Sequence, residues 1–374
     1  MPADSAAPSP PPRALINLTA NDWGIVIGNA PRVHGLRFNL SDRGIEQIDG
    51  LNVTFWKPRE TSRGVINGVA LGLLAPAARH INGISLGTIA TVGESSLRGI
   101  SAAAIATVSE GVIQGVSAAG IAVIGEQRVT GITAAGIAVI SNGKLIGVSA
   151  SGLATIGRTG LWGVHAAGLA TVSEGDAFGV TASGLATVCE GGLHGIGAAG
   201  LAIVTEGAVD GVALAGLTTV CDGTMTGIAI AGGVIITEET IRGLAVGGIA
   251  LPSRVDDESK RWSLPGIKAR EIRGLAVHGM NIQVSRRASG ILVSGIHLSG
   301  DVLAGIGAAP VIRAGELKGI GAGLVNLGAR RQTGIMVGLL NSTPELRGIQ
   351  VGLLNHAGNN PKGFQWLPGI NLHF

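Results

Sequence analysis

The hydrophobic and polar positions of this chain repeat every sixteen residues between Gly99 and Ile249. Each unit begins with a glycine, as in G-V-S-A-A-G-I-A-V-I-G-E-Q-R-V-T from Gly115 to Thr130. Counted from that glycine, position 2 is Val, Ile or Leu, position 7 is Ile or Leu in nearly every unit, and position 10 is Val or Ile. Position 15 is usually large and apolar. A fixed short period of this kind indicates a repeat architecture.

The unit divides into short strand-like pieces that are separated by turns. Positions 11 to 14 contain S-E-G, C-E-G, T-E-G or C-D-G, which is typical turn chemistry. A helix is disfavoured because each glycine in its interior would cost roughly 1 kcal/mol relative to alanine. β-Branched residues with glycine corners suit one coil of a β-solenoid, which stacks on the next coil at about 4.8 Å.

We therefore predict an all-β fold, an elongated β-solenoid (β-helix) of about twenty short coils with terminal caps. Small residues would let the narrow coil close, and positions 2, 7, 10 and 15 would fill its axis. The alternative is an outer-membrane β-barrel, since the chain ends in an alternating strand with a terminal Phe, Gly369 to Phe374. Such barrels carry aromatic girdles, whereas this chain has no tyrosine and 3% aromatic residues.

The pattern also divides the chain into segments. We predict a disordered Pro/Ala linker over 1–14, an N-terminal cap with the first coils over 15–66, and the regular array over 67–250. An inserted polar loop over 251–266 and looser C-terminal coils with an aromatic cap over 267–374 follow. The cap residues are Phe364, Trp366 and Phe374.

Polar residues of the two ends suggest local roles. The N-terminal segment holds a charged group, comprising Arg37, Asp42, Arg43, Glu46 and Asp49. It belongs either to the cap or to a ligand-binding site. Near the other end, an asparagine recurs at equivalent positions and is expected to form a hydrogen-bonded ladder, namely Asn326, Asn341 and Asn355.

Composition argues against several function classes. The net charge is +3 and the basic residues are scattered along the sequence, so nucleic-acid binding is not expected. The segment from Gly195 to Gly200 matches G-x-G-x-x-G, but it is part of the repeat and does not join a strand to a helix. Cys189 and Cys221 are two repeats apart, about 9.6 Å in a solenoid, which is too far for a disulfide.

The histidines have no metal-ligand spacing, and the acids at position 12 form a row of solvated charges. We predict no catalytic, cofactor-binding or metal-binding residues, no cofactor, and no enzymatic activity.

One feature predicts a partner. The apolar positions are too many for all of them to point inward, so either positions 3–5 or positions 7–9 must be partly exposed. Over ten coils this makes a strip larger than the apolar patches of typical monomers. The strip would contact another copy of the chain, another surface protein or a membrane surface. Candidate contacts are Ile121, Val123, Leu169 and Thr171 on the strip, and Arg261 and Trp262 in the polar loop.

The ends of the repeat array resemble a known family. The phrase G-I-Q-V-G-L-L-N-H-A from Gly348 to Ala357, the closing L-P-G-I-N-L-H-F and the opening W-G-I-V-I-G-N resemble bacterial surface-repeat-containing proteins. The resemblance implies an exported protein at the cell surface, in the outer membrane or outside the cell. The family has no established activity, so the resemblance assigns no functional residue.

From these observations we expect a non-enzymatic structural or interaction protein of the bacterial surface, whose flat apolar faces mediate self-assembly or contact with a partner or membrane. The alternative is a ligand-binding module that uses loop 252–265 or the N-terminal charged group.

Overall fold

The structure is a computed structural model that describes residues 14–56, 64–249, 253–254, 262–263 and 265–374. These residues form about 19 turns of a parallel β-solenoid and no helix. The chain divides into two compact units, unit 1 over 1–175 and unit 2 over 176–374. The parallel pairing of successive coils confirms the solenoid prediction and its sixteen-residue period.

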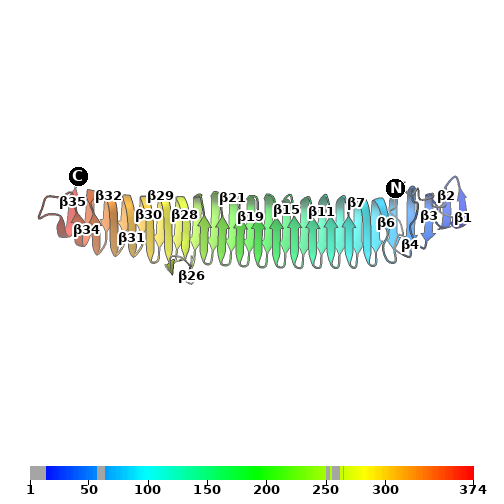
Figure 1. The fold of residues 1–374 in the computed structure, drawn as a ribbon, viewed down its shortest axis with the longest axis horizontal. Coiled ribbons are helices and arrows are strands. Elements are labelled where there is room, and N and C mark those ends of the chain that lie inside the picture. The colour runs from blue at the N-terminus through cyan, green and yellow to red at the C-terminus, as the bar shows by residue number, and fades with distance from the viewer. Residues whose placement is uncertain (1–13, 57–63, 250–252, 255–261, 264) are drawn as a thin grey trace, which may run out of the picture. The chain divides into compact units, whose positions relative to one another are not determined.

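Unit 1 contains sixteen strands in the described residues (Figure 1). They are β1 (Ala14–Ala20), β2 (Trp23–Gly28), β3 (Arg32–Asn39), β4 (Gln47–Thr54), β5 (Val65–Gly72), β6 (Ala77–Gly87), β7 (Ala90–Ala103), β8 (Ala106–Ser109), β9 (Val112–Ala119), β10 (Ala122–Gly125), β11 (Arg128–Ala135), β12 (Ala138–Ser141), β13 (Lys144–Ser151), β14 (Ala154–Gly157), β15 (Leu161–Ala167) and β16 (Ala170–Ser173).

Unit 2 begins with the same alternation of long and short strands and ends with longer ones. Its strands in the described residues are β17 (Ala177–Ser183), β18 (Ala186–Cys189), β19 (Leu193–Ala199), β20 (Ala202–Thr205), β21 (Val209–Ala215), β22 (Thr218–Cys221), β23 (Met225–Ala231), β24 (Val234–Thr237), β25 (Thr240–Gly247), β26 (Ser253–Arg254), β27 (Trp262–Ser263), β28 (Gly266–His278), β29 (Asn281–Ser294), β30 (His297–Ala308), β31 (Val311–Ala322), β32 (Val325–Val337), β33 (Leu340–Thr343), β34 (Glu345–Ala357) and β35 (Trp366–His373).

The polar insertion leaves the stack unbroken. β26 and β27 pair with each other in a separate two-stranded sheet. Across the insertion, β25 pairs in parallel with β28 and places Gly243 opposite Gly274. The register of the coils therefore continues from β25 to β28.

Antiparallel strands occupy both chain ends of the stack. β1 turns back on β2 through Asn21 and Asp22, which both have positive φ angles, 51° and 66°. At the other end β35 lies antiparallel on β34. The three residues of the predicted aromatic cap, Phe364, Trp366 and Phe374, are all exposed.

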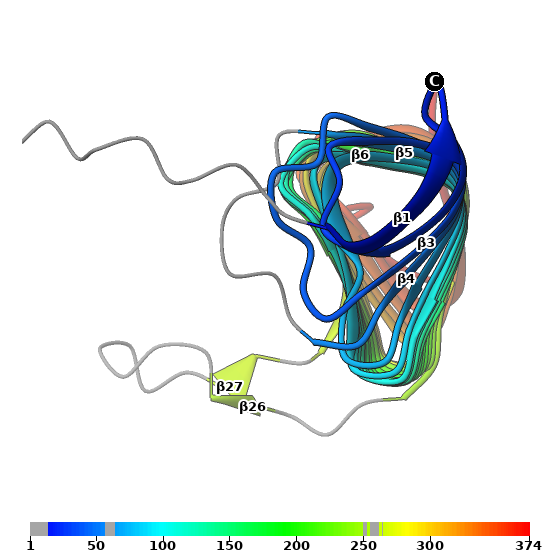
Figure 2. The ribbon, with the colours of Figure 1, turned by 90° about the vertical axis from the view of Figure 1, so that its right-hand side faces the viewer.

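Each regular coil has the same anatomy. A strand of seven or eight residues covers positions 14 or 15 to 5, and a four-residue strand covers positions 8 to 11. Turns lie at positions 6–7 and 12–13. Each strand pairs in register with its equivalent sixteen residues away, as Val129 does with Leu145. Viewed along the stack, the cyan and green coils of unit 1 therefore overlie one another (Figure 2).

The interior is lined by positions 3, 5, 9, 11 and 15. In one coil these are Ser117, Ala119, Val123, Gly125 and Val129, all buried. Only position 15 carries large apolar side chains throughout unit 1, so its prediction is confirmed. The prediction that positions 2, 7 and 10 also fill the axis is wrong. Positions 2 and 7 point outward and position 10 is half-buried, because side chains of a strand alternate between its two sides.

The first glycines of successive coils form a column, and the backbone conformation requires glycine at each of these positions. Gly147 has a φ of 114°, a region that favours glycine. A Cβ added there would lie 2.2 Å from the carbonyl oxygen of Gly131 in the preceding coil. Glycine is therefore fixed both by the bend of the strand and by the close approach of the neighbouring coil.

We predict that Gly147→Ala destabilises the protein more than Gly363→Ala does. Gly363 also has a positive φ, 98°, but a Cβ there would meet nothing within 4 Å. Both variants incur the conformational cost of about 1–3 kcal/mol, and only Gly147→Ala adds the steric clash. Thermal unfolding followed by circular dichroism measures the difference. Equal losses would show that the φ angle alone requires glycine.

Candidate functional site

The four predicted strip residues divide between surface and core. Ile121 is 44% exposed and Leu169 is 43% exposed, whereas Val123 and Thr171 are completely buried. The prediction is therefore wrong for Val123 and Thr171. Position 7 lies in a turn and points outward, while position 9 lies in the short strand and faces the interior.

The two loop candidates are not brought to the strip by the described structure. Arg261 lies outside the described residues. Trp262 belongs to β27, whose backbone pairs with Arg254. Their role as partner contacts stays a prediction.

Exposed aliphatic side chains form two columns on unit 1. Equivalent residues of successive coils pair in register at position 2, and at position 7 they are joined by backbone hydrogen bonds such as Ile137 N–H to Ile121 O, so the side chains of each column follow one another at the sheet spacing of about 4.8 Å. The exposed members of the position 2 column are Ile25, Leu36, Ile84, Ile100, Val116, Ile132, Val148 and Val164. Those of the position 7 column are Ile89, Ile105, Ile121, Ile137, Leu153 and Leu169.

A shallow groove of about 1050 Å³ follows unit 1 along positions 4 to 6. Its floor consists of alanine and glycine, as at Ala118, Ala119 and Gly120, and it begins beside Phe55 and Leu73. Small residues are required there, since a Cβ on Gly120 would lie 1.9 Å from the carbonyl oxygen of Ala104. In chain order the groove lies between the position 2 and position 7 columns, so one apolar surface includes all three features.

Unit 2 exposes equivalent side chains. Its position 2 column contains Ile196, Ile228, Leu275, Ile291, Ile306, Ile320 and Ile335, and exposed aliphatic residues at position 4 are Leu214, Ile230, Val293, Val337 and Val351. The sequence contained a signal for these columns. Position 15 is large and apolar, and counting in steps of two from it places positions 3 and 5 inside and positions 2 and 4 outside.

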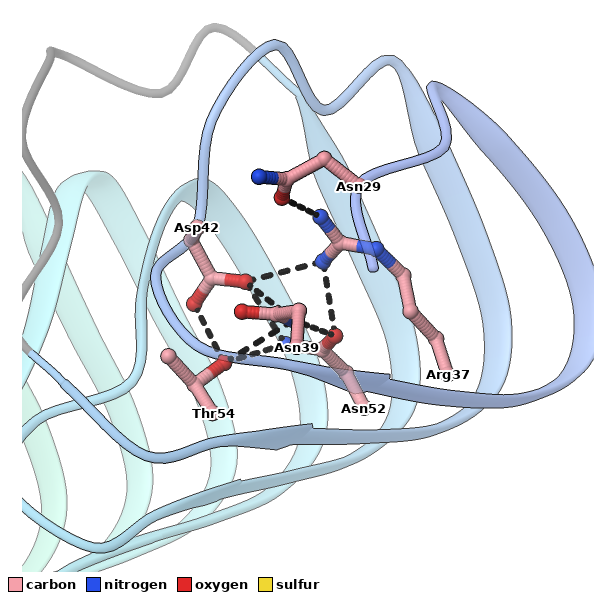
Figure 3. Close-up of polar contacts among 6 residues, drawn as sticks. All are labelled: Asn29, Arg37, Asn39, Asp42, Asn52 and Thr54. Carbon is pink, nitrogen blue, oxygen red and sulfur yellow. Dashed lines mark hydrogen bonds and ion pairs between the residues drawn. The ribbon is translucent and has the colours of Figure 1, made fainter. Parts of the chain in front are cut away.

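The N-terminal charged group contains a buried ion pair (Figure 3). Arg37 lies on β3 and donates from Nη1 to Asp42 Oδ1 at 2.8 Å and to Asn52 Oδ1 at 2.8 Å. Its Nη2 donates to Asn29 Oδ1 at 2.7 Å. Thr54 donates to the other carboxylate oxygen of Asp42 at 2.7 Å. The cluster holds the loop after β3 against the coil.

The burial and charge of this cluster indicate that the Arg37–Asp42 pair has a structural role. Both Arg37 and Asp42 are fully buried. Burial lowers the pKa of the Arg37 guanidinium, and the Asp42 carboxylate opposes that shift. Arginine remains charged nevertheless. Because each charge is neutralised by the other inside the coil, these two residues do not present a ligand-binding site at the surface.

The two cysteines and the possible metal ligands do not form a reactive site in the described residues. Cys189 and Cys221 are free and buried, and burial raises the pKa of the Cys189 thiol to about 12, which disfavours the reactive thiolate. The described residues contain no group of His, Cys, Asp and Glu that could hold a metal ion. They also contain no helix long and apolar enough to cross a membrane.

The predicted asparagine ladder is confirmed. Asn326 Nδ2 donates to Asn341 Oδ1 at 2.8 Å, and Asn341 Nδ2 donates to Asn355 Oδ1 at 2.7 Å. All three side chains are buried. The ladder satisfies the amides of Asn341 and Asn355 inside the stack, whereas the Oδ1 of Asn326, at the end of the ladder, is buried without a hydrogen-bond partner.

A buried histidine gives the interior a pH-sensitive position. His165 occupies position 3, where its Nδ1 lies 2.8 Å from the Ser149 hydroxyl. Burial lowers the pKa of His165 to about 4, while the Trp162 backbone has a smaller opposite effect. The folded protein therefore binds a proton at His165 less readily than the unfolded chain does.

We predict that Asp42→Asn destabilises the protein by about 3–5 kcal/mol, because it leaves the Arg37 charge buried without its counter-ion. The matched control is Glu46→Gln, which breaks an exposed pair with Arg32 at 2.7 Å. That control should lose about 0–1 kcal/mol. Urea unfolding of both variants measures the two losses, and a small loss for Asp42→Asn would contradict the structural role of the pair.

We predict that His165 makes the protein less stable as the pH falls from about 6.5 to 4. Since the folded-state pKa is lowered, the unfolded chain takes up the proton first, and the loss reaches about 3 kcal/mol at pH 4. Above pH 6.5 the effect is absent. His165→Ser, which copies Ser149 of the preceding coil, should remove this part of the pH dependence in unfolding measurements. An unchanged pH dependence would contradict the assignment.

The comparisons with known proteins find no relative that could extend this description. No family model matches the chain, and searches of curated proteins and of solved structures find no match. The functional argument therefore rests on the geometry of the coils and on the exposed columns.

Proposed function

We propose that the protein is a non-enzymatic structural protein of the bacterial surface, which associates with further copies of itself through its exposed aliphatic columns. The single observation that carries this proposal is the pair of exposed columns on unit 1, at positions 2 and 7. Monomeric soluble proteins rarely expose contiguous apolar patches larger than a few hundred Å². Surfaces of this kind are usually covered by a partner.

A second copy is the occupant that the surface favours. The columns repeat at the spacing of the coils, and an identical solenoid has columns with the same spacing. The position 7 column of one copy can therefore pack beside the alanine and glycine groove of another copy, along the length of the groove. Closed pairs of this kind are the commonest form of homo-oligomer.

The location at a bacterial surface has a different basis. It rests on the likeness of the terminal phrases to bacterial surface-repeat proteins, and the geometry of the coils adds nothing to it. Fractionation of the cells that produce the protein tests this part separately.

We predict that the triple variant Ile105→Asn, Ile121→Asn and Ile137→Asn weakens self-association at least tenfold, which corresponds to about 1.4 kcal/mol. These side chains are adjacent in the position 7 column and lie outside the core. Sedimentation of the wild type and the variant without detergent, over a range of concentrations, measures the change. Circular dichroism checks that the variant is folded.

The matched control replaces Gln114 and Gln127 by asparagine, since both are exposed polar positions of the same coils. It should associate as the wild type does. A wild type that stays monomeric at high concentration would overturn the proposal. If that monomer floats with phosphatidylcholine vesicles and the triple variant does not, the columns contact lipid in place of a second copy.

A further inference from the structure

Charge is segregated along unit 2. From 176 to 249 the acids are Asp176, Glu190, Glu206, Asp210, Asp222, Glu238 and Glu239, and the basic residue is Arg242. From 265 to 374 the basic residues are Lys268, Arg270, Arg273, Arg286, Arg287, Arg313, Lys318, Arg330, Arg331, Arg347 and Lys362, and the acids are Glu271, Asp301, Glu316 and Glu345. The first part of the unit is therefore strongly acidic and the second strongly basic.

The solenoid brings most of these charges to one edge. Nearly all of them occupy the turn at positions 12 and 13 or the outward positions 14 and 16 beside it. The pairing register joins these positions from coil to coil, with Asp210 opposite Thr226, Thr226 opposite Arg242, and Arg242 opposite Arg273. Farther along, Glu316 pairs with Arg331 and Arg331 with Glu345. Residues scattered in the sequence therefore form one charged edge.

Ion pairs within the basic part leave it with a surplus of cations. Glu271 contacts Arg273 at 2.8 Å and Arg286 at 3.3 Å. Glu345 is likewise shared by Arg331 at 2.9 Å and Arg347 at 3.2 Å. A hollow of about 600 Å³ is lined by three arginines and two acids, namely Arg273, Arg286, Arg287, Glu271 and Asp301.

The charged edge borders the apolar columns of the same unit. On β29 the outward residues are Arg287, Ser289, Ile291 and Val293, so the strand passes from charged to apolar in four outward positions. The outward residues of β23 likewise end with two exposed aliphatic side chains, Ile228 and Ile230. An apolar centre with a charged rim is the usual anatomy of a protein interface.

We propose that unit 2 docks against unit 2 of a second copy in antiparallel orientation, with the acidic part of each facing the basic part of the other. This inference rests on the proposed self-association and adds a second contact, through unit 2, with a defined orientation. The acidic part extends over about five coils, roughly 24 Å, and the basic part over about six coils, roughly 29 Å. A two-fold axis between the parts therefore makes both halves of the contact complementary.

Electrostatics selects the orientation, and apolar contact supplies most of the affinity. Exposed ion pairs contribute only about 0–1 kcal/mol each. A parallel arrangement would oppose acid to acid and base to base, and like-charge juxtaposition at an interface costs several kcal/mol. The antiparallel arrangement avoids that cost.

The test uses two charge-reversed forms of the full chain. One carries Arg273→Glu, Arg286→Glu and Arg287→Glu, and the other carries Glu206→Lys, Asp210→Lys and Asp222→Lys. We expect each form alone to self-associate at least tenfold more weakly than the wild type in low salt. Mixed in equal amounts, the two forms should associate more tightly than either form alone, because the unchanged acidic part of the first then faces the unchanged basic part of the second.

The matched control reverses exposed acids of unit 1, namely Glu110→Lys, Glu126→Lys and Glu174→Lys. It should associate as the wild type does. Wild-type association should also weaken as salt is raised, since the screening length falls from about 30 Å at 0.01 M to about 8 Å at 0.15 M.

Spin labels report the orientation directly. Single cysteines replace Thr226 or Ser289, and the native cysteines are buried. Two distances between copies are compared, both from a label at Thr226 of one copy. In the antiparallel pair, its distance to Ser289 of the second copy is shorter than its distance to Thr226 of the second copy. The opposite order would overturn the inference.

Failure of the proposed self-association and failure of the proposed orientation give different results. A wild type that is monomeric at all concentrations overturns both the proposed self-association and its orientation. Charge-reversed forms that each self-associate as tightly as the wild type overturn the orientation alone.

Discussion

Backbone pairing between successive coils at a column of glycines is the constraint on which this structure depends. The strand bends at the first glycine of each coil, and the carbonyl oxygen of the preceding coil occupies the space where a Cβ would lie. No other residue fits both conditions. Because that column fixes the register, every other position of the repeat becomes a column too, either inside the coil or outside it.

The narrow interior explains why the surface is apolar. Positions 3, 5 and 11 mostly hold small residues, and position 15 carries most of the large apolar side chains. The core therefore has little room for the remaining aliphatic residues of the repeat, and they lie outside at positions 2 and 7. Where the interior must hold charge, as at Arg37 and Asp42, the groups are paired and surrounded by amide and hydroxyl oxygens. An apolar exterior around a small, partly polar interior is what favours association as the function.

Stacking also gives charge a spatial order that the linear sequence hides. Basic residues between 265 and 374 are separated by up to twenty-five positions, yet the coil period places many of them on one edge of unit 2. The same edge is acidic in the preceding coils. Long-range attraction is weak for single exposed pairs, but an ordered pattern of opposite signs distinguishes one orientation of a partner from another.

The sequence by itself determined the fold class, the period, the glycine corners, the polar insertion and the asparagine ladder, because each follows from residue type at a fixed spacing. It also indicated that an apolar strip had to remain exposed. Only the tertiary structure decided which columns form that strip, since Ile121 and Leu169 lie outside while Val123 and Thr171 lie inside. The side on which a column lies depends on the strand alternation and on the bend at the glycine. The row of acids at position 12 followed from the sequence, but the basic part of the charged edge did not, since it depends on the in-register pairing of the less regular C-terminal coils.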